Sequence, residues 1–456
     1  MKLVKSWVLA AMVAFAPAAV AQPAPAAAAV STDPQIKFER YKLPNGLEVI
    51  LAPDPSVPLV AVNVWYHVGS GYEVPGKSGF AHLFEHMMFQ GSKHVPEDKH
   101  FDILKKIGSD QVNGTTNTDR TNYFEVVPSN QIETALWLES DRMGYLLDKL
   151  TRDSLTNQID VVRNERRQNY DNRPYGKALF AEYEALFPEG HPYRHLTIGK
   201  HEDLIAASVD DVKNFFKTWY VPANATLCIS GDFDLAHGKE LVAKWFGGFP
   251  TSTKPQVTVI PPPNTMAKTV SVTDDKLAKL TQVIFAWQSP ANFAPGDAEL
   301  DIAANALAAE GTGSLYKALV YDQPIAQSVR AGQEGLSFSG IFEITVTLRS
   351  DSKATVDDVK KIVMDQVAKL AREPLAQAEI DRVVAENEAQ TIRSLETVFG
   401  RSQALQSCNH YKGDPGCITW NLDRYRKTTA GEIRTVVAQT LKPDHVVTVI
   451  TVPQGK

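Results

Sequence analysis

The segment that decides the fold reads LVAVNVWYHVGSGYEVPGKSGFAHLFEHMMFQGS, residues 59–92. Its first twelve residues alternate apolar and polar side chains, a pattern typical of a half-buried β-strand. From residue 80 onward the apolar residues follow a helical spacing instead, with Phe80, Leu83, Phe84 and Met87 covering the helix. A strand that passes through a glycine-rich turn into an amphipathic helix indicates a sheet covered by helices.

Strand-like and helix-like runs recur on both sides of a proline-rich stretch. Residues 249–265 contain five prolines, which exclude a helix and disfavour an interior strand. A chain of 456 residues also exceeds the size at which one hydrophobic core stops growing. We therefore expect an α+β fold of two similar domains, each a mainly antiparallel sheet with helices on one face. The expected boundaries are 33–250 for the first domain, 251–265 for the linker and 266–456 for the second.

The beginning of the chain has the pattern of an export signal. Two lysines precede an apolar run that ends in Ala19-Val20-Ala21, the small residues that signal peptidase accepts. We interpret residues 1–21 as a signal peptide, with a membrane anchor as the alternative, and residues 22–32 as a flexible leader. No later run is apolar enough to span a membrane, so the expected mature chain is periplasmic and has no membrane span.

Charge and cysteine content narrow the function classes further. Lys and Arg number 47 against 53 Asp and Glu, and no basic block is present, which argues against a nucleic-acid partner. Three cysteines allow at most one disulfide. Cys408 and Cys417 lie in a loop-like stretch and are the expected pair, whereas Cys228 lies in a strand-like run and is expected to be a buried thiol.

The helix-like segment carries an HxxEH pattern made by His82, Glu85 and His86. Positions i and i+4 of a helix lie one above the other, so both imidazoles can reach one metal ion while Glu85 projects beside them. The alternative is a pair of ordinary histidines on an amphipathic helix.

A catalytic zinc ion takes three protein ligands and leaves a fourth position open. Glu165 is the candidate for the third ligand, because it continues an apolar helical stripe formed by Leu155, Gln158, Ile159 and Val162. An acid at the end of such a stripe needs a partner. The alternative is a solvated glutamate among the neighbouring arginines.

Several segments together resemble the inverted-motif zinc peptidases, the family of pitrilysin, insulysin and mitochondrial processing peptidase, and in particular its short two-domain bacterial members. The matching segments are GSGYEVPGKSGFAHLFEHMMFQGS, NGTTNTDRTNYFEVVP, VVRNERRQNYDNRPYG, HPYRHLTIG and YVPANATLCISGDF. The resemblance implies that His82, His86 and Glu165 hold one Zn2+ per chain and that Glu85 is the general base. It also implies a zinc endopeptidase that hydrolyses unfolded or short peptides, with the zinc site in the first domain.

The resemblance assigns further residues around the site. Asn113, Gly114 and Thr115 match a family edge strand that pairs with the substrate backbone, although Asn113 before a glycine is equally typical of a turn. Glu73 matches a family acid that would orient a metal-ligand histidine, with a surface salt bridge as the alternative. Gln158 stands where many relatives have a glutamate, which removes one negative charge near the metal.

The second half lacks two residues that hold the substrate in the family, and this difference bears on whether the chain needs a partner subunit. Relatives carry an Arg and a Tyr that hold the substrate, and the aligned positions here are Val320 and Gln327. This absence predicts a heterodimer in which a homologous partner subunit supplies the Arg/Tyr pair. The alternative is a shifted alignment in which another arginine, such as Arg330, takes the role. A non-catalytic peptide-binding scaffold is the alternative function, and a zinc enzyme with a non-peptide substrate does not fit the strand-pairing segment.

Overall fold

The computed structural model describes residues 33–454 except 110 and 259, and the residues from Pro34 onward form one compact unit. The expected signal peptide and leader lie outside the described residues. Among the helices that the structure describes, none has the length and apolar character needed to cross a membrane.

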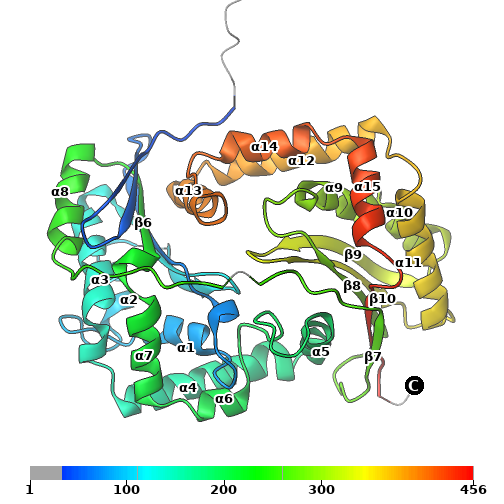
Figure 1. Cartoon of the computed structure of the whole chain (residues 1–456), viewed down its shortest axis with the longest axis horizontal. Helices are drawn as coiled ribbons and strands as arrows, with labels where there is room; N and C mark the ends of the chain where they lie inside the picture. The colour runs from blue at the N-terminus through cyan, green and yellow to red at the C-terminus, as the bar shows by residue number, and fades with distance from the viewer. Residues whose placement is uncertain (1–32, 110, 259, 455–456) are drawn as a thin grey trace, which may run out of the picture. The chain divides into compact units, whose positions relative to one another are not determined.

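The described residues form two β-sheets (Figure 1). The first has the order β1-β2-β6-β3-β5-β4 and the second β7-β11-β8-β10-β9. The strands of the first sheet are β1 (Glu39–Lys42), β2 (Glu48–Pro53), β3 (Leu59–Tyr66), β4 (Gln111–Thr116), β5 (Thr121–Pro128) and β6 (Ala225–Gly231). Those of the second sheet are β7 (Lys268–Val272), β8 (Gln282–Ser289), β9 (Ala326–Gly335), β10 (Gly340–Leu348) and β11 (Val447–Thr451).

The two sheets share one topology. Without β1, each sheet places its strands in the order first, last, second, fourth, third along the chain. In each sheet the first and last strands pair in parallel, β2 with β6 and β7 with β11, and the other neighbours are antiparallel. The prediction of two similar, mainly antiparallel α+β halves is confirmed. The described residues of the proline-rich stretch 251–265 form neither helix nor strand.

Helices complete both halves. In the first half they are α1 (Phe80–Met87), α2 (Lys99–Lys106), α3 (Ile132–Tyr145), α4 (Arg152–Arg166), α5 (Gly176–Leu186), α6 (His201–Ile205), α7 (Val209–Trp219) and α8 (Leu235–Phe246). In the second half they are α9 (Asp297–Ala308), α10 (Ser314–Tyr316), α11 (Val356–Leu370), α12 (Gln377–Ser394), α13 (Val398–Lys412), α14 (Ile418–Arg426) and α15 (Ala430–Thr440). Helices of each half pack on one face of its own sheet, as expected.

The opposite face of each sheet is covered by a helix from the other half. α13 packs on β3 and β6, and Figure 1 shows it beside β6. Leu405 of α13 joins a buried cluster with Ile50 and Cys228. In return, α5 packs on β7, β8 and β11 of the second sheet. The prediction of a half-buried strand at residues 59–66 is therefore wrong, because β3 is buried on both faces from Val60 onward.

Polar contacts and a disulfide hold α13 in this position. The buried amide of Gln406 donates to the carbonyl oxygens of Asn63 and Thr226, at 2.9 and 2.8 Å. A disulfide joins Cys408, in α13, to Cys417 at the beginning of α14, so the expected pair is present. The expected loop at Cys408 is wrong, because α13 continues past this residue. Cys228 is a buried free thiol, as predicted.

Replacing both bridged cysteines by alanine is expected to lower the free energy of unfolding. The bridge closes a loop of nine residues, for which the loss of loop-closure entropy predicts about 2–3 kcal/mol. Urea titrations of wild type and of Cys408→Ala/Cys417→Ala measure the difference. Reductant should destabilise the wild type and leave the double variant unchanged; equal stability of the two oxidised proteins would contradict the prediction.

Candidate metal centre

The candidate centre lies between α1 and α4, two helices that contact each other. α1 carries His82 and His86 one turn apart, and α4 carries Glu165 in its last turn. The beginning of α4 is stabilised by a capping box in which the side chains of Thr151 and Ser154 bond to each other's backbone N–H.

The structure brings the two histidines and Glu165 together. Glu165 Oε2 lies 3.6 Å from His82 Nε2 and 3.4 Å from His86 Nε2. One ligand atom from each of the three residues lies within 4.8 Å of the other two. Atoms bound tetrahedrally to one zinc ion at its usual bond lengths lie roughly 3.3–3.6 Å apart. The three side chains therefore have the donor types and the spacing of a zinc site.

The protonation of His82 and of Glu165 suits a metal. Burial lowers the pKa of His82 to about 4, which leaves the neutral imidazole that a metal needs. Burial favours the neutral form of His86 too, but Glu165 and Glu85 outweigh it and raise the pKa of His86. The hydrogen bond with His86 is the main cause that lowers the pKa of Glu165, so this carboxylate is ionised.

Glu85 lies beside the three residues and is held by strand β4. Only 8% of Glu85 is exposed, and Thr116 donates a hydrogen bond of 2.6 Å to its Oε2. Burial raises the pKa of Glu85, which moves the carboxylate toward the range useful for a general base at neutral pH. Gly114 leaves the room that Glu85 occupies, because a Cβ at this position would lie 2.9 Å from Glu85 Cγ.

The Gly114→Ala variant is expected to displace Glu85 and to lower kcat for peptide hydrolysis by roughly 10- to 100-fold, because small misplacements of a reacting group are costly. Zinc content should stay unchanged, since no metal ligand moves. Steady-state kinetics and metal analysis measure both quantities. Gly248→Ala is the matched control, because a Cβ there meets no atom within 4 Å. Full activity of Gly114→Ala would show that Glu85 tolerates the added methyl group.

The strand that was expected to bind substrate lies at the edge of the first sheet. Among the described residues, β4 pairs only with β5, so its other edge is unpaired within this part of the sheet. Asn113 accepts a hydrogen bond from the N–H of Gly114, and Thr115 donates to Asn122. Because alternate residues face opposite sides of a strand, Gly114 and Thr116 face Glu85 whereas Asn113 and Thr115 do not.

Thr116 is the residue that sequence reasoning missed. It belongs to the matching segment NGTTNTDRTNYFEVVP but received no role there. Its position two residues after Gly114 puts both on the same face of an extended strand, which is the signal that could have identified it.

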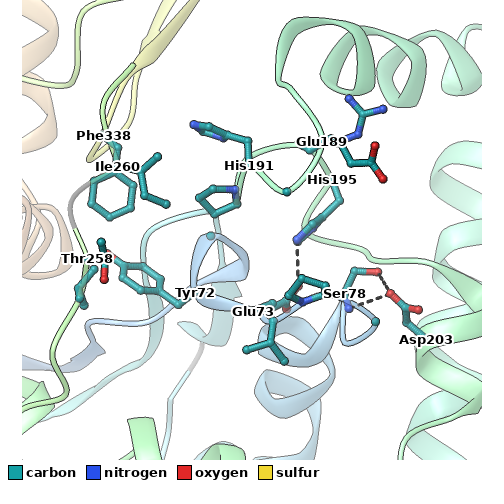
Figure 2. A pocket seen from close by; sticks show the side chains of 18 of the residues that line it. Tyr72, Glu73, Ser78, Glu189, His191, His195, Asp203, Thr258, Ile260 and Phe338 are labelled. Atoms are coloured by element: carbon teal, nitrogen blue, oxygen red, sulfur yellow. Dashed lines mark hydrogen bonds and ion pairs between the residues drawn. The ribbon is translucent and has the colours of Figure 1, made fainter. Parts of the chain in front are cut away.

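Glu73 contacts the backbone of the metal helix rather than a metal-site imidazole. Its fully buried carboxylate accepts hydrogen bonds from the N–H groups of Gly79 and Ala81, at 2.8 and 2.7 Å. Gly79 is the N-cap of α1 and has no side chain to cap it, so Glu73 satisfies these N–H groups instead. Glu73 Oε2 lies 3.6 Å from His195 Nε2, and both residues line a cavity of about 470 Å³. Figure 2 shows these two side chains facing each other.

Gln158 lies close to the centre. Its side chain is buried and forms a hydrogen bond that helps to raise the pKa of His86. The neutral amide therefore supports this imidazole without adding a charge.

The positions aligned with the family Arg and Tyr lie in the second half. Val320 belongs to a short π-helical turn (Lys317–Asp322) and packs against the second core. Gln327 is exposed near the beginning of β9, and Arg330 follows it on the same strand. Neither Val320 nor Gln327 offers a guanidinium group or a phenol.

Comparison with known proteins agrees with the fold. The family model described as insulinase (peptidase family M16) matches residues 48–186, and that described as peptidase M16 inactive domain matches residues 206–387. The zinc protease PqqE of Helicobacter pylori is 29% identical over 366 residues, which are 79% of this chain and 81% of that protein.

Other relatives extend the comparison. The crystal structure of a protease from Helicobacter pylori superposes with a TM-score of 0.85 at 26% identity and covers 92% of this chain and 100% of that chain. The mitochondrial-processing peptidase subunit beta of Lentinula edodes is 23% identical over 370 residues, 78% of this chain and 77% of that protein. The two family models together match more than two thirds of the chain, which belongs to the insulinase family, peptidase family M16.

Proposed function

We propose that this chain is a zinc-dependent endopeptidase that hydrolyses unfolded or short peptides. The observation that carries the proposal is the convergence of His82, His86 and Glu165 beside the buried carboxylate of Glu85. The name of the relative PqqE, a zinc protease, supports the same metal and reaction class.

His82, His86 and Glu165 would hold the zinc ion. When bound, zinc supplies Lewis acidity, which polarises a scissile carbonyl group and acidifies an attacking water. Glu85 takes up the proton of that water at its carboxylate and passes it to the leaving amine. Thr116 holds one carboxylate oxygen of Glu85, so the other oxygen, Oε1, is the one available to carry the proton.

The unpaired edge of β4 supports a peptide as the substrate. An extended peptide can add to this edge through backbone hydrogen bonds, which a folded segment cannot supply. Because Gly114 and Thr116 of the same strand approach Glu85, a peptide paired with β4 would pass beside the general base. This arrangement favours flexible substrates over particular sequences.

The proposal also includes a second, homologous subunit. Val320 and Gln327 supply neither a guanidinium group nor a phenol, so we assign this role to a homologous partner that carries an Arg and a Tyr. The relative from Lentinula edodes is itself named as a subunit. The signal-like residues 1–21 support an exported, periplasmic enzyme.

Metal analysis combined with a cleavage assay tests the proposal. The purified chain should contain one zinc ion and should cleave a quenched fluorescent peptide rich in Gly and Ser, with a higher rate after the homologous partner is added. A chelator should abolish cleavage and added zinc should restore it. A chain without zinc contradicts the proposal. Zinc without cleavage, even with the partner present, favours the non-catalytic scaffold, and full activity without the partner contradicts the heterodimer.

A further inference from the structure

The carboxylate of Asp119, in the turn between β4 and β5, joins the two halves of the chain. Asp119 is fully buried, and its Oδ1 accepts a hydrogen bond of 2.7 Å from the hydroxyl of Tyr193 in the first half. Its Oδ2 accepts from the N–H of Ser337 at 2.9 Å and from the hydroxyl of Tyr411 at 3.3 Å. Ser337 lies between β9 and β10, and Tyr411 lies in α13. Two of the three donors therefore come from the second half.

The turn between β9 and β10 has a fixed place on the first half. The N–H of Phe338 donates to the hydroxyl oxygen of Tyr193 at 3.2 Å, and the two rings stack with their centroids 5.6 Å apart. Figure 2 shows Phe338 next to Tyr72, and these ring centroids lie 6.1 Å apart. The bond from Ser337 to Asp119 is thus part of a packed contact between the halves.

The β4–β5 turn, residues 117–120, begins directly after Thr116. The hydroxyl of Thr116 donates to Glu85 at 2.6 Å. Within the turn, Asn117 Oδ1 accepts from the N–H groups of Asp119 and Arg120, at 2.9 and 2.8 Å, so the turn moves as one unit. Because hydrogen bonds weaken with small changes in distance and angle, a shift of this turn would loosen the hold of Thr116 on Glu85.

Other bonds keep the β4–β5 turn folded without Asp119. The carbonyl oxygens of Asn117 and Thr118 accept hydrogen bonds from the N–H groups of Ser70 and Gly71, at 3.1 and 2.8 Å. These bonds join backbone groups and do not require the Asp119 side chain. A substitution of Asp119 is therefore expected to shift the turn, not to unfold it.

We infer that Asp119 is a positioning residue, through which the second half of the chain fixes Thr116 and therefore Glu85. This inference rests on the proposed peptidase function. His82, Glu85, His86 and Glu165 all lie in the first half. The contact at Asp119 thus gives the second half a part in catalysis that requires no contact with the substrate.

The Asp119→Asn variant of the zinc-loaded full chain, with the homologous partner present, tests the inference. Asparagine keeps the size of the side chain but replaces one acceptor oxygen by a donor, so it cannot accept from both Tyr193 and Ser337. We expect kcat for a flexible peptide to fall roughly 10-fold while KM changes less than about 2-fold, because a misplaced reacting group slows the chemical step. Zinc content should be unchanged. An unchanged kcat, or a loss of zinc, would overturn the inference.

A double-mutant cycle shows whether Asp119 acts through Thr116. In a Thr116→Val background, Asp119→Asn should lower kcat by less than about a further 2-fold, because the contact that it displaces is already absent. Equal losses in both backgrounds would overturn the inference, since a purely structural effect is additive. Tyr411→Phe removes a donor of the second half, keeps the ring and should lower kcat about 2- to 3-fold. If Asp119→Asn does not fold, Tyr411→Phe in the same two backgrounds decides by the same criterion.

Asp301→Asn is the matched control. Asp301 of α9 accepts a hydrogen bond of 2.6 Å from the hydroxyl of Tyr425, within the second half. The control should reduce stability in urea without changing kcat; a lower kcat would overturn the inference, because lost stability alone would explain the effect. If the unsubstituted chain with zinc and partner does not cleave peptides, the peptidase proposal fails and the inference fails with it. Cleavage by that chain with an unaffected kcat for Asp119→Asn overturns the inference alone.

Discussion

The Glu85→Gln variant is expected to lose peptide hydrolysis by at least about 100-fold, and by as much as about 10,000-fold, because a neutral amide cannot carry the proton that general base catalysis requires. The substitution keeps the size of the side chain and an oxygen that can accept the hydrogen bond from Thr116. His82, His86 and Glu165 are unchanged, so zinc content should remain at the wild-type value. We therefore expect the variant to have a lower kcat and an unchanged zinc content.

Steady-state kinetics on a flexible peptide and mass-spectrometric metal analysis measure these two quantities on the same preparation. Glu240→Gln is the matched control, because its side chain is 81% exposed and lies on α8, away from the metal centre. If Glu85→Gln retained more than about a tenth of the wild-type kcat, proton transfer by Glu85 would not be the source of catalysis. If it also lost zinc, the effect would instead be on metal binding.

Arg142→Met is expected to lower the free energy of unfolding by about 3–5 kcal/mol, because it leaves a buried carboxylate without its counter-charge. Arg142 is 1% exposed and donates from Nε to Glu139 Oε2 at 2.9 Å, and its Nη2 lies 3.9 Å from Glu125 Oε2. Both glutamates are fully buried. The guanidinium also lies over the rings of Phe89 and Tyr123, at 5.0 and 4.4 Å from their centroids.

Urea denaturation of the variant and the wild type measures this difference. Arg349→Met is the matched control: its ion pair with Asp351 is exposed, so its loss should be below about 1 kcal/mol. Adding Glu139→Leu to Arg142→Met should recover part of the stability, since the uncompensated charge is removed. A loss for Arg142→Met as small as that of the control would show that Glu139 becomes protonated at little cost.

Part of the metal centre could be predicted because its geometry is local. His82 and His86 are four residues apart, and the α-helix alone places such residues on one face. The strand at Leu59–Tyr66 and the helix at Phe80–Met87 were likewise predicted from their periodicity. The resemblance to the inverted-motif zinc peptidases assigned Glu165 to the metal. Nothing in the residues around Glu165 shows that this side chain reaches the two histidines.

Other elements had no clear local signal. β9 reads AQSVRAGQEG, a polar run without apolar alternation, because an edge strand with a cavity beside it buries few of its side chains. Cys408 appeared to lie in a loop because polar residues and then Gly413, Pro415 and Gly416 follow it, yet packing against the first sheet extends α13 through it. The contact of Thr116 with Glu85 likewise joins residues 31 positions apart.

The amino-acid sequence by itself determined the elements with strong periodicity, the spacing of the two histidines and the absence of a helix across the prolines. Only the tertiary structure decided that Glu165 meets both histidines, that α5 and α13 each cover the sheet of the other half, and that Asp119 binds Ser337 and Tyr411 of the second half. The physical reason is that dihedral preferences and side-chain periodicity act between neighbours in the chain. Contacts between distant residues depend instead on how all the apolar faces are buried together.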